Sequence, residues 1–146
     1  MAKKDSGGFS EAEREAMKQR AAELRASKGL KGSAKREREA QACADAIAAM
    51  AGTDKQVARL LDDIVTELAP HLDPKTMYGF PAYALDGKVV VFYQPAARWD
   101  SRYGTVAFEE IAKLDDGPLW ATSFAVLEVT DEVTKKLREL VTKAVG

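Results

Sequence analysis

The sequence predicts an α+β fold, in which helices pack on one side of a small antiparallel sheet of about four or more strands, with a helical extension at the N-terminus. Two observations indicate the helices: residues 53–69 and the segment from Asp131 onward carry apolar side chains at intervals of three and four. A third indicates the sheet, because residues 75–94 hold the longest β-branched and aromatic run of the chain. The helices need an apolar surface to cover, and this sheet is the only large candidate.

The N-terminal part predicts a separate helical arm. Ser10 and Glu13 have the spacing of a capping box, in which each side chain bonds the other residue's backbone N–H, so we expect a helix from there to about Ala26. Residues 27–33 are rich in glycine, serine and lysine and are typical of a flexible linker. We therefore expect residues 1–33 to form a flexible, basic helical arm and linker.

The remaining residues, 34–146, are expected to form a single α+β domain. Its first helix is predicted from Ala34 to about Met50, and Gly52 is expected to end it. A second capping box at 53–56 predicts the start of the next helix, which Pro70 stops.

The sheet is predicted as a meander. Pro81 lacks a backbone N–H, so its strand is placed at an edge or a bulge, and Asp86-Gly87 is the preferred pair for a tight hairpin turn. A helix from about Asp131 closes the chain, with its apolar residues on one stripe. The predicted strands cover residues 78–84, 89–93, 103–108 and 121–129, and a short helix is expected at 108–114.

Charge and cysteine content narrow the class of protein. The net charge is −1, but the first 40 residues are basic, which is compatible with a nucleic-acid contact. Because acidic residues are interspersed among the basic ones, a solvated helical arm is the favoured interpretation. The basic candidates for a nucleic-acid contact are Arg14, Lys18, Arg25, Lys28 and Lys31, followed by Lys35, Arg36 and Arg38. A single cysteine, Cys43, fits a reducing cytoplasm, and no apolar run is long enough to predict a membrane span.

No catalytic or metal motif stands out. The only histidine, His71, lies in a proline-flanked loop, and one histidine with one cysteine cannot make a zinc site. Carboxylates could instead hold iron: Asp63 and Glu67 are four residues apart, so both project from one helical face, although such faces are usually only solvated. We expect no cofactor, leave iron open, and favour a protein that is not an enzyme.

Aromatic residues indicate a ligand groove. Tyr78, Tyr83 and Trp99 belong to an aromatic cluster that either fills the core or lines a groove with polar tips, and Tyr83 and Trp99 are expected to be its exposed members. Arg98 and Arg102 flank Trp99 and would hold an anionic group.

The segment Met77-Tyr-Gly-Phe-Pro-Ala-Tyr83, followed by Gly87-Lys88 and a strand through Phe92, resembles the Tyr-Gly-Met-Pro-Ala-Phe … Gly-Lys … Phe signature of the YdhG-like domain family. The resemblance extends over about residues 53–145, because the flanking helices and the stretch from Leu114 to Ala125 also fit. These are small bacterial proteins with a domain of unknown function. The resemblance implies a compact α+β domain with helices on one side of an antiparallel sheet. Some members of the family resemble frataxin in delivering iron.

Two functions therefore stay open. The first is a non-enzymatic binding domain that takes a small ligand, a metal ion such as iron, or a partner protein on the face or edge of the sheet. The second is a nucleic-acid-associated protein that uses the basic arm, for which phosphate contacts would need a clustered basic surface that glutamates here interrupt.

Overall fold

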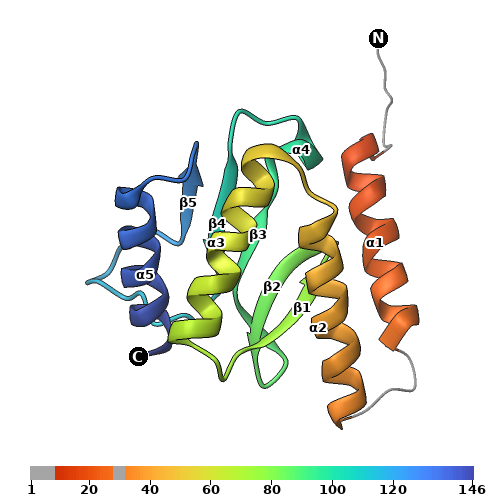
Figure 1. The fold of residues 1–146 in the computed structure, drawn as a ribbon, viewed down its shortest axis with the longest axis horizontal. Coiled ribbons are helices and arrows are strands. Elements are labelled where there is room, and N and C mark those ends of the chain that lie inside the picture. The colour runs from red at the N-terminus through yellow and green to blue at the C-terminus, as the bar shows by residue number, and fades with distance from the viewer. Residues whose placement is uncertain (1–8, 28–31) are drawn as a thin grey trace.

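The computed structural model describes residues 9–27 and 32–146, so Lys28, Lys31 and most of the predicted linker lie outside the described residues. The predicted α+β class is confirmed (Figure 1). In chain order the elements are α1 (Glu11–Ser27), α2 (Gly32–Ala48), α3 (Gly52–Leu68), β1 (Asp73–Met77), β2 (Phe80–Leu85), β3 (Lys88–Gln94), α4 (Ala96–Trp99), β4 (Gly104–Phe108), β5 (Ser123–Val126) and α5 (Asp131–Val145).

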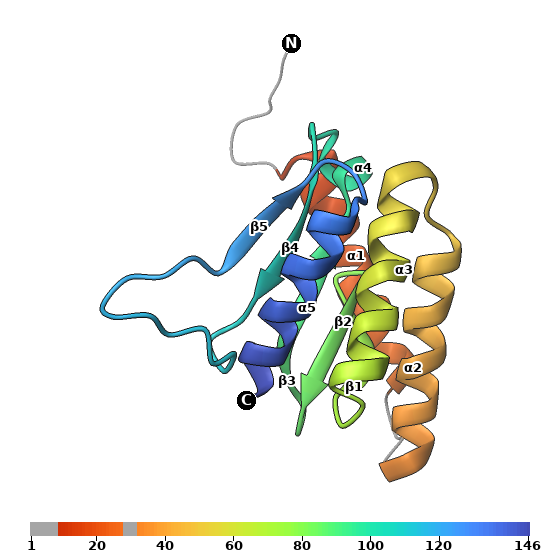
Figure 2. The same cartoon turned by 60° about the vertical axis from the view of Figure 1, so that its left-hand side comes forward.

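The sheet is an antiparallel meander in the order β1-β2-β3-β4-β5. Helices α2, α3 and α5 lie on one of its faces, as predicted (Figure 2). The buried side chains of that interface form the core, with α3 and α5 contributing the inward stripes that their periodicity predicts. The largest fully buried side chains there are Tyr83, Tyr93, Leu61 and Ile64. Among the described residues no helix is long and apolar enough to cross a membrane.

The start of the sheet differs from the prediction. Strand β1 was not expected, and Tyr78 and Gly79 form the turn between β1 and β2, with φ of 54° and 84°. Pro81 was expected to mark an edge or a bulge. Because β2 pairs with β1 and β3, the edge is wrong, whereas β2 does carry a register irregularity, between Tyr83 and Ala84 rather than at Pro81. The missing N–H is tolerated because Pro81 pairs only with Thr76 of β1, and the β2–β3 register begins one residue later, at Ala82.

Two connections also depart from expectation. The short helix predicted at 108–114 is absent. A single turn is closed by the Ala112 N–H and the Glu109 carbonyl, and the next N–H, that of Lys113, donates to the carbonyl of Ala144 at the end of α5. Helix α4 was not predicted. The Asp86-Gly87 hairpin is confirmed, with φ of 50° and 85° at its two turn residues.

Helix starts show which capping signals hold. At α1 the predicted box is present: the Ser10 N–H donates to Glu13 at 2.8 Å, and the Glu13 N–H donates to the Ser10 hydroxyl at 3.1 Å. The box predicted at 53–56 is wrong, because α3 begins at Gly52 behind Ala51, which makes no side-chain cap bond. Gly52, with φ of 58°, thus starts α3 instead of ending α2.

Helix α1 lies alongside α2 at the β1 side of the sheet (Figure 1). Its contacts to α2 and β1 bring the N-terminal segment against the domain predicted for residues 34–146. The division of the chain at residue 33 stays a prediction. The position of α1 matters for function, because α1 supplies one wall of the largest cavity described below.

Candidate functional site

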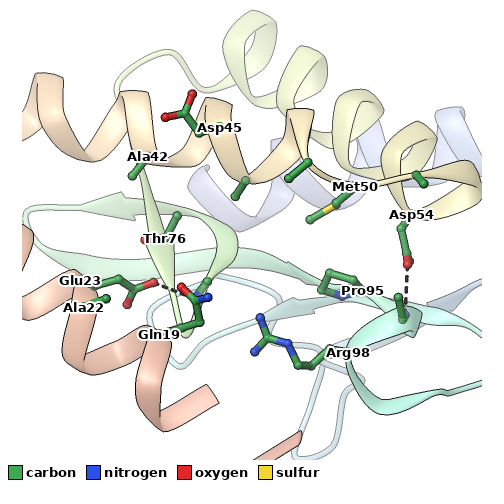
Figure 3. Close-up of a pocket in the computed structure, with 15 residues that line it drawn as sticks. Gln19, Ala22, Glu23, Ala42, Asp45, Met50, Asp54, Thr76, Pro95 and Arg98 are labelled. Atoms are coloured by element: carbon green, nitrogen blue, oxygen red, sulfur yellow. Dashed lines mark hydrogen bonds between the residues drawn. The ribbon is translucent and has the colours of Figure 1, made fainter. Parts of the chain in front are cut away.

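A groove of about 770 Å³ opens between α1, the end of α2, the start of α3, the β1–β2 turn and α4 (Figure 3). Its walls are small and apolar, since six alanines contribute to them together with Met50 and Pro95. The volume lies in the range of about 300–1,000 Å³ that is usual for small-molecule sites. Four charged side chains also line it: Glu23, Asp45, Asp54 and Arg98.

Glu23 fixes α1 at the edge of this groove. Its carboxylate accepts hydrogen bonds from the backbone N–H groups of Tyr78, at 3.2 Å, and Gly79, at 2.7 Å. Both residues have positive φ, and this turned backbone presents two successive N–H groups to the carboxylate. A side chain at Gly79 would meet the Gln19 side chain at 3.1 Å and Arg98 at 3.0 Å, so glycine also allows the close approach of α1.

Arg98 is the one cationic side chain among the residues that line the groove. Its Nη1 donates to the carbonyl of Tyr78 at 3.0 Å, and its guanidinium lies 4.8 Å from the centre of the Phe80 ring. Figure 3 shows the side chain extending from α4 toward Gln19. Within the described residues no carboxylate forms an ion pair with it. Arg98 is therefore held in place but not neutralised.

Asp54 positions α4, and with it Arg98. Its carboxylate accepts three hydrogen bonds: from the Tyr93 hydroxyl at 2.6 Å, from the Ala96 N–H at 2.8 Å and from the Ala97 N–H at 3.1 Å. Burial, and next the hydrogen bond to Asp54, raises the pKa of Tyr93, so this hydroxyl stays a donor. Gly104 leaves room for it, because a Cβ at that position would collide with the Tyr93 hydroxyl.

The predicted ligand residues separate into two groups. Arg98 lines the groove, and Tyr78 reaches it through its carbonyl bond to Arg98. Trp99 is exposed, as expected, but does not line the groove, and Arg102 lies 5.1 Å from the ring of Tyr103 instead. These two side chains are therefore not assembled with Arg98 into one site.

The expectation that Tyr83 is exposed is wrong, because its side chain is 0% exposed. It lies in the core, where its hydroxyl donates to Asp62 of α3 at 2.8 Å and lies 4.0 Å from the Cys43 sulfur of α2. Burial raises the pKa of Tyr83 and raises the pKa of the Cys43 thiol to about 11. Tyr83 therefore connects β2 of the sheet to α2 and α3.

The carboxylates considered for iron are not gathered into a larger cluster. Glu67 accepts two hydrogen bonds from Arg138 of α5, at 2.9 and 2.8 Å, and these bonds lower the pKa of Glu67. Asp63 is exposed on the neighbouring turn. Among the described residues there is no group of three or more histidine, cysteine or acidic side chains that could hold a metal ion. Iron binding at Asp63 and Glu67 stays a prediction.

The basic candidates of α1 are exposed. Arg14, Lys18 and Arg25 are separated by four and seven residues, which places them on one stripe of the helix. None of the three lines the groove, whose α1 residues are Gln19, Ala22 and Glu23. Nucleic-acid binding through this stripe stays a prediction.

Sequence reasoning missed Asp54, Glu23 and Gln19. A signal for Asp54 exists, because Asp54 precedes Val57, Ala58 and Leu61 by three, four and seven residues and so lies on the apolar stripe of α3. An acidic residue on the apolar stripe of a helix indicates a buried carboxylate that accepts hydrogen bonds from other segments of the chain. Glu23 offers no such signal, since the turn that it binds is 55 residues away.

Comparisons with protein-family models, with curated proteins and with solved structures found no match for this chain. The groove and its residues therefore carry the functional argument, and the resemblance to YdhG-like domains stays a prediction from sequence.

Proposed function

We propose that this protein is a non-enzymatic binding domain of the YdhG-like kind, whose ligand is a small molecule with an apolar body and an anionic group. The ligand lies in the groove beside the β1–β2 turn rather than on the open face of the sheet. The observation that carries this proposal is Arg98, a cationic side chain held in an alanine-lined groove with no acidic partner among the described residues.

The geometry of Arg98 suits an anion. One guanidinium nitrogen is fixed by the Tyr78 carbonyl and the plane is supported by Phe80, so little side-chain freedom is left to lose on binding. The remaining N–H groups match the planar fork of a carboxylate. The alanines beside Arg98 leave room for an aliphatic chain, and burial of that chain against the apolar wall is favourable.

Two groove carboxylates are already engaged in holding the structure. Glu23 accepts from the turn and Asp54 accepts from α4 and Tyr93, so both are explained by positioning. The third groove carboxylate, Asp45, is exposed and accepts a hydrogen bond from the Gln41 side chain at 2.8 Å. Among the described residues none of the three acids pairs with Arg98, which supports Arg98 as the contact for an anionic ligand.

Octanoate is a suitable probe, since it has an aliphatic chain and a single carboxylate. We expect saturable chemical-shift changes in ¹H–¹⁵N spectra at Gly79 and Ala97, and weaker changes with the uncharged octanol. Arg98→Gln is expected to weaken octanoate binding about tenfold, the effect of losing a hydrogen bond to a charged group. Arg102→Gln is the matched control, because Arg102 contacts Tyr103 outside the groove.

Equal binding of octanoate by Arg98→Gln and the unaltered protein would refute the proposal, as would shift changes confined to residues outside the groove.

The frataxin-like version of the proposal, delivery of iron, rests on the resemblance. Titration calorimetry with ferrous iron in the absence of oxygen tests it, and the lack of a saturable heat would remove it.

A further inference from the structure

A second, smaller cavity of about 150 Å³ lies between α1, the first half of α2 and β1. It is distinct from the groove in its charge, because its lining includes four cationic side chains and only two acidic ones. The cationic residues are Arg20 of α1, Lys35 and Arg38 of α2, and Lys75 of β1.

Both acids are already bound within the protein. Glu23 accepts from the β1–β2 turn and lies 3.7 Å from Arg20, and Glu39 forms an ion pair with Lys75 at 3.8 Å. Lys35 and Arg38, by contrast, form no ion pair in the described part of the chain. Two positive charges in this cavity are therefore uncompensated.

The placement of Lys35 and Arg38 concentrates these charges. They are three residues apart, so both project from the same face of α2, toward α1. Helix α2 has no acidic residue in its first turn, and the positive end of its dipole adds to the potential there. The cavity is smaller than the usual small-molecule pocket of about 300–1,000 Å³, which favours a single compact oxyanion.

We propose that this α1–α2 cavity is a binding site for a phosphate group, with Lys35 and Arg38 as the residues that contact it. The phosphate is either free, as inorganic phosphate, or part of the backbone of a single-stranded nucleic acid. The ligand chemistry is shared by both sources, and the two are separated by experiment. The site adjoins the groove, with which it shares Glu23, Ala42 and Thr76, but its cationic residues are different from Arg98.

The test uses titration calorimetry of the full chain at low salt, with inorganic phosphate in one arm and a short single-stranded oligonucleotide in the other. We expect saturable binding in at least one arm, weakened about tenfold or more by the double substitution Lys35→Gln, Arg38→Gln. The matched control is Arg14→Gln, Lys18→Gln, which removes the same charge from the outward stripe of α1 and is expected to leave affinity unchanged.

Binding of both probes with mutual competition identifies a phosphate within a nucleic acid, and binding of inorganic phosphate alone identifies the free ion. Both results support the site, and chemical-shift changes at Lys35 and Arg38 in the unaltered protein do so without relying on a variant. Equal loss of affinity in the two double variants would show only a general attraction to the basic arm and would overturn the proposal. So would the absence of saturable binding in both arms.

Discussion

Asp54 holds a short helix, a buried tyrosine and one wall of the groove together, so its removal tests the positioning argument directly. Asp54→Ala leaves the Tyr93 hydroxyl, which is 0% exposed, without its acceptor, and frees the N–H groups of Ala96 and Ala97. A buried donor left unsatisfied costs about 1–3 kcal/mol, and the two part-buried N–H groups regain some water, so we expect a loss of about 3–4 kcal/mol in the free energy of unfolding.

Urea unfolding measures this loss, and a double-mutant cycle with Tyr93→Phe separates the contribution of the shared hydrogen bond. We expect the two substitutions to be non-additive by about 1–2 kcal/mol, since they remove the same contact. Asp45→Ala is the control: Asp45 also lines the groove but is exposed, and its loss is expected to change stability by no more than about 0.5 kcal/mol.

A loss of less than about 1 kcal/mol in Asp54→Ala would show that the three hydrogen bonds of Asp54 are not what holds α4. Strictly additive losses of unfolding free energy in Asp54→Ala and Tyr93→Phe would contradict the shared hydrogen bond. A loss of the expected size, accompanied by altered shifts at Arg98, would instead link this network to the groove.

Gly104→Ala should lower the stability by about 1–3 kcal/mol in thermal unfolding, because the added methyl meets the Tyr93 hydroxyl and the Gln94 carbonyl; an unchanged melting temperature would contradict the packing. Gly79→Val should cost about 1–2 kcal/mol or more, since Gly79 has φ of 84°, and a normal melting curve would argue against this turn. The buried Cys43 thiol should resist Ellman's reagent at pH 8 until denaturant is added, and labelling at the rate of an exposed thiol would refute its burial. Because the pKa of Cys43 is raised from 9.0 to about 11, its stabilising effect is intact below pH 9 and is lost as pH rises toward 11, a decline that Cys43→Ala should lack.

Much of the fold follows from short-range signals. The stripes of α3 and α5 repeat every three to four residues, and Asp86-Gly87 takes the positive φ values that this pair prefers in tight hairpins. Both features depend on residues that are neighbours in sequence, so pattern and structure agree. The capping box of Ser10 and Glu13 is local in the same sense.

The errors arise where distant residues decide the structure. Tyr78 and Gly79 belong to an aromatic run that is typical of a strand, yet they form a turn whose N–H groups bind Glu23 of α1. Tyr83 was expected to be exposed, but Asp62 accepts its hydrogen bond and removes the cost of burying the hydroxyl. No pattern within the run reveals either partner.

Only part of the groove lining was predicted, because its other residues are brought together by contacts between distant segments. Arg98 was predicted because it flanks Trp99 together with Arg102, and a guanidinium suits an anionic group. Asp54 was missed because its role depends on Tyr93 and on the two N–H groups of α4, which meet it only in the folded chain. A groove made by five separate segments has no signature in any one of them.

The sequential strand order also has a consequence for how the molecule assembles. Every strand pairs with its neighbour in the chain, and the longest connection between paired strands covers residues 109–122. Strand pairing is therefore local in sequence, which favours fast folding. The bonds from Glu23 to the β1–β2 turn span 55 and 56 residues and require that turn to exist first. We therefore expect α1 to dock after the sheet has formed, so that the groove is the last feature of the native state to be completed.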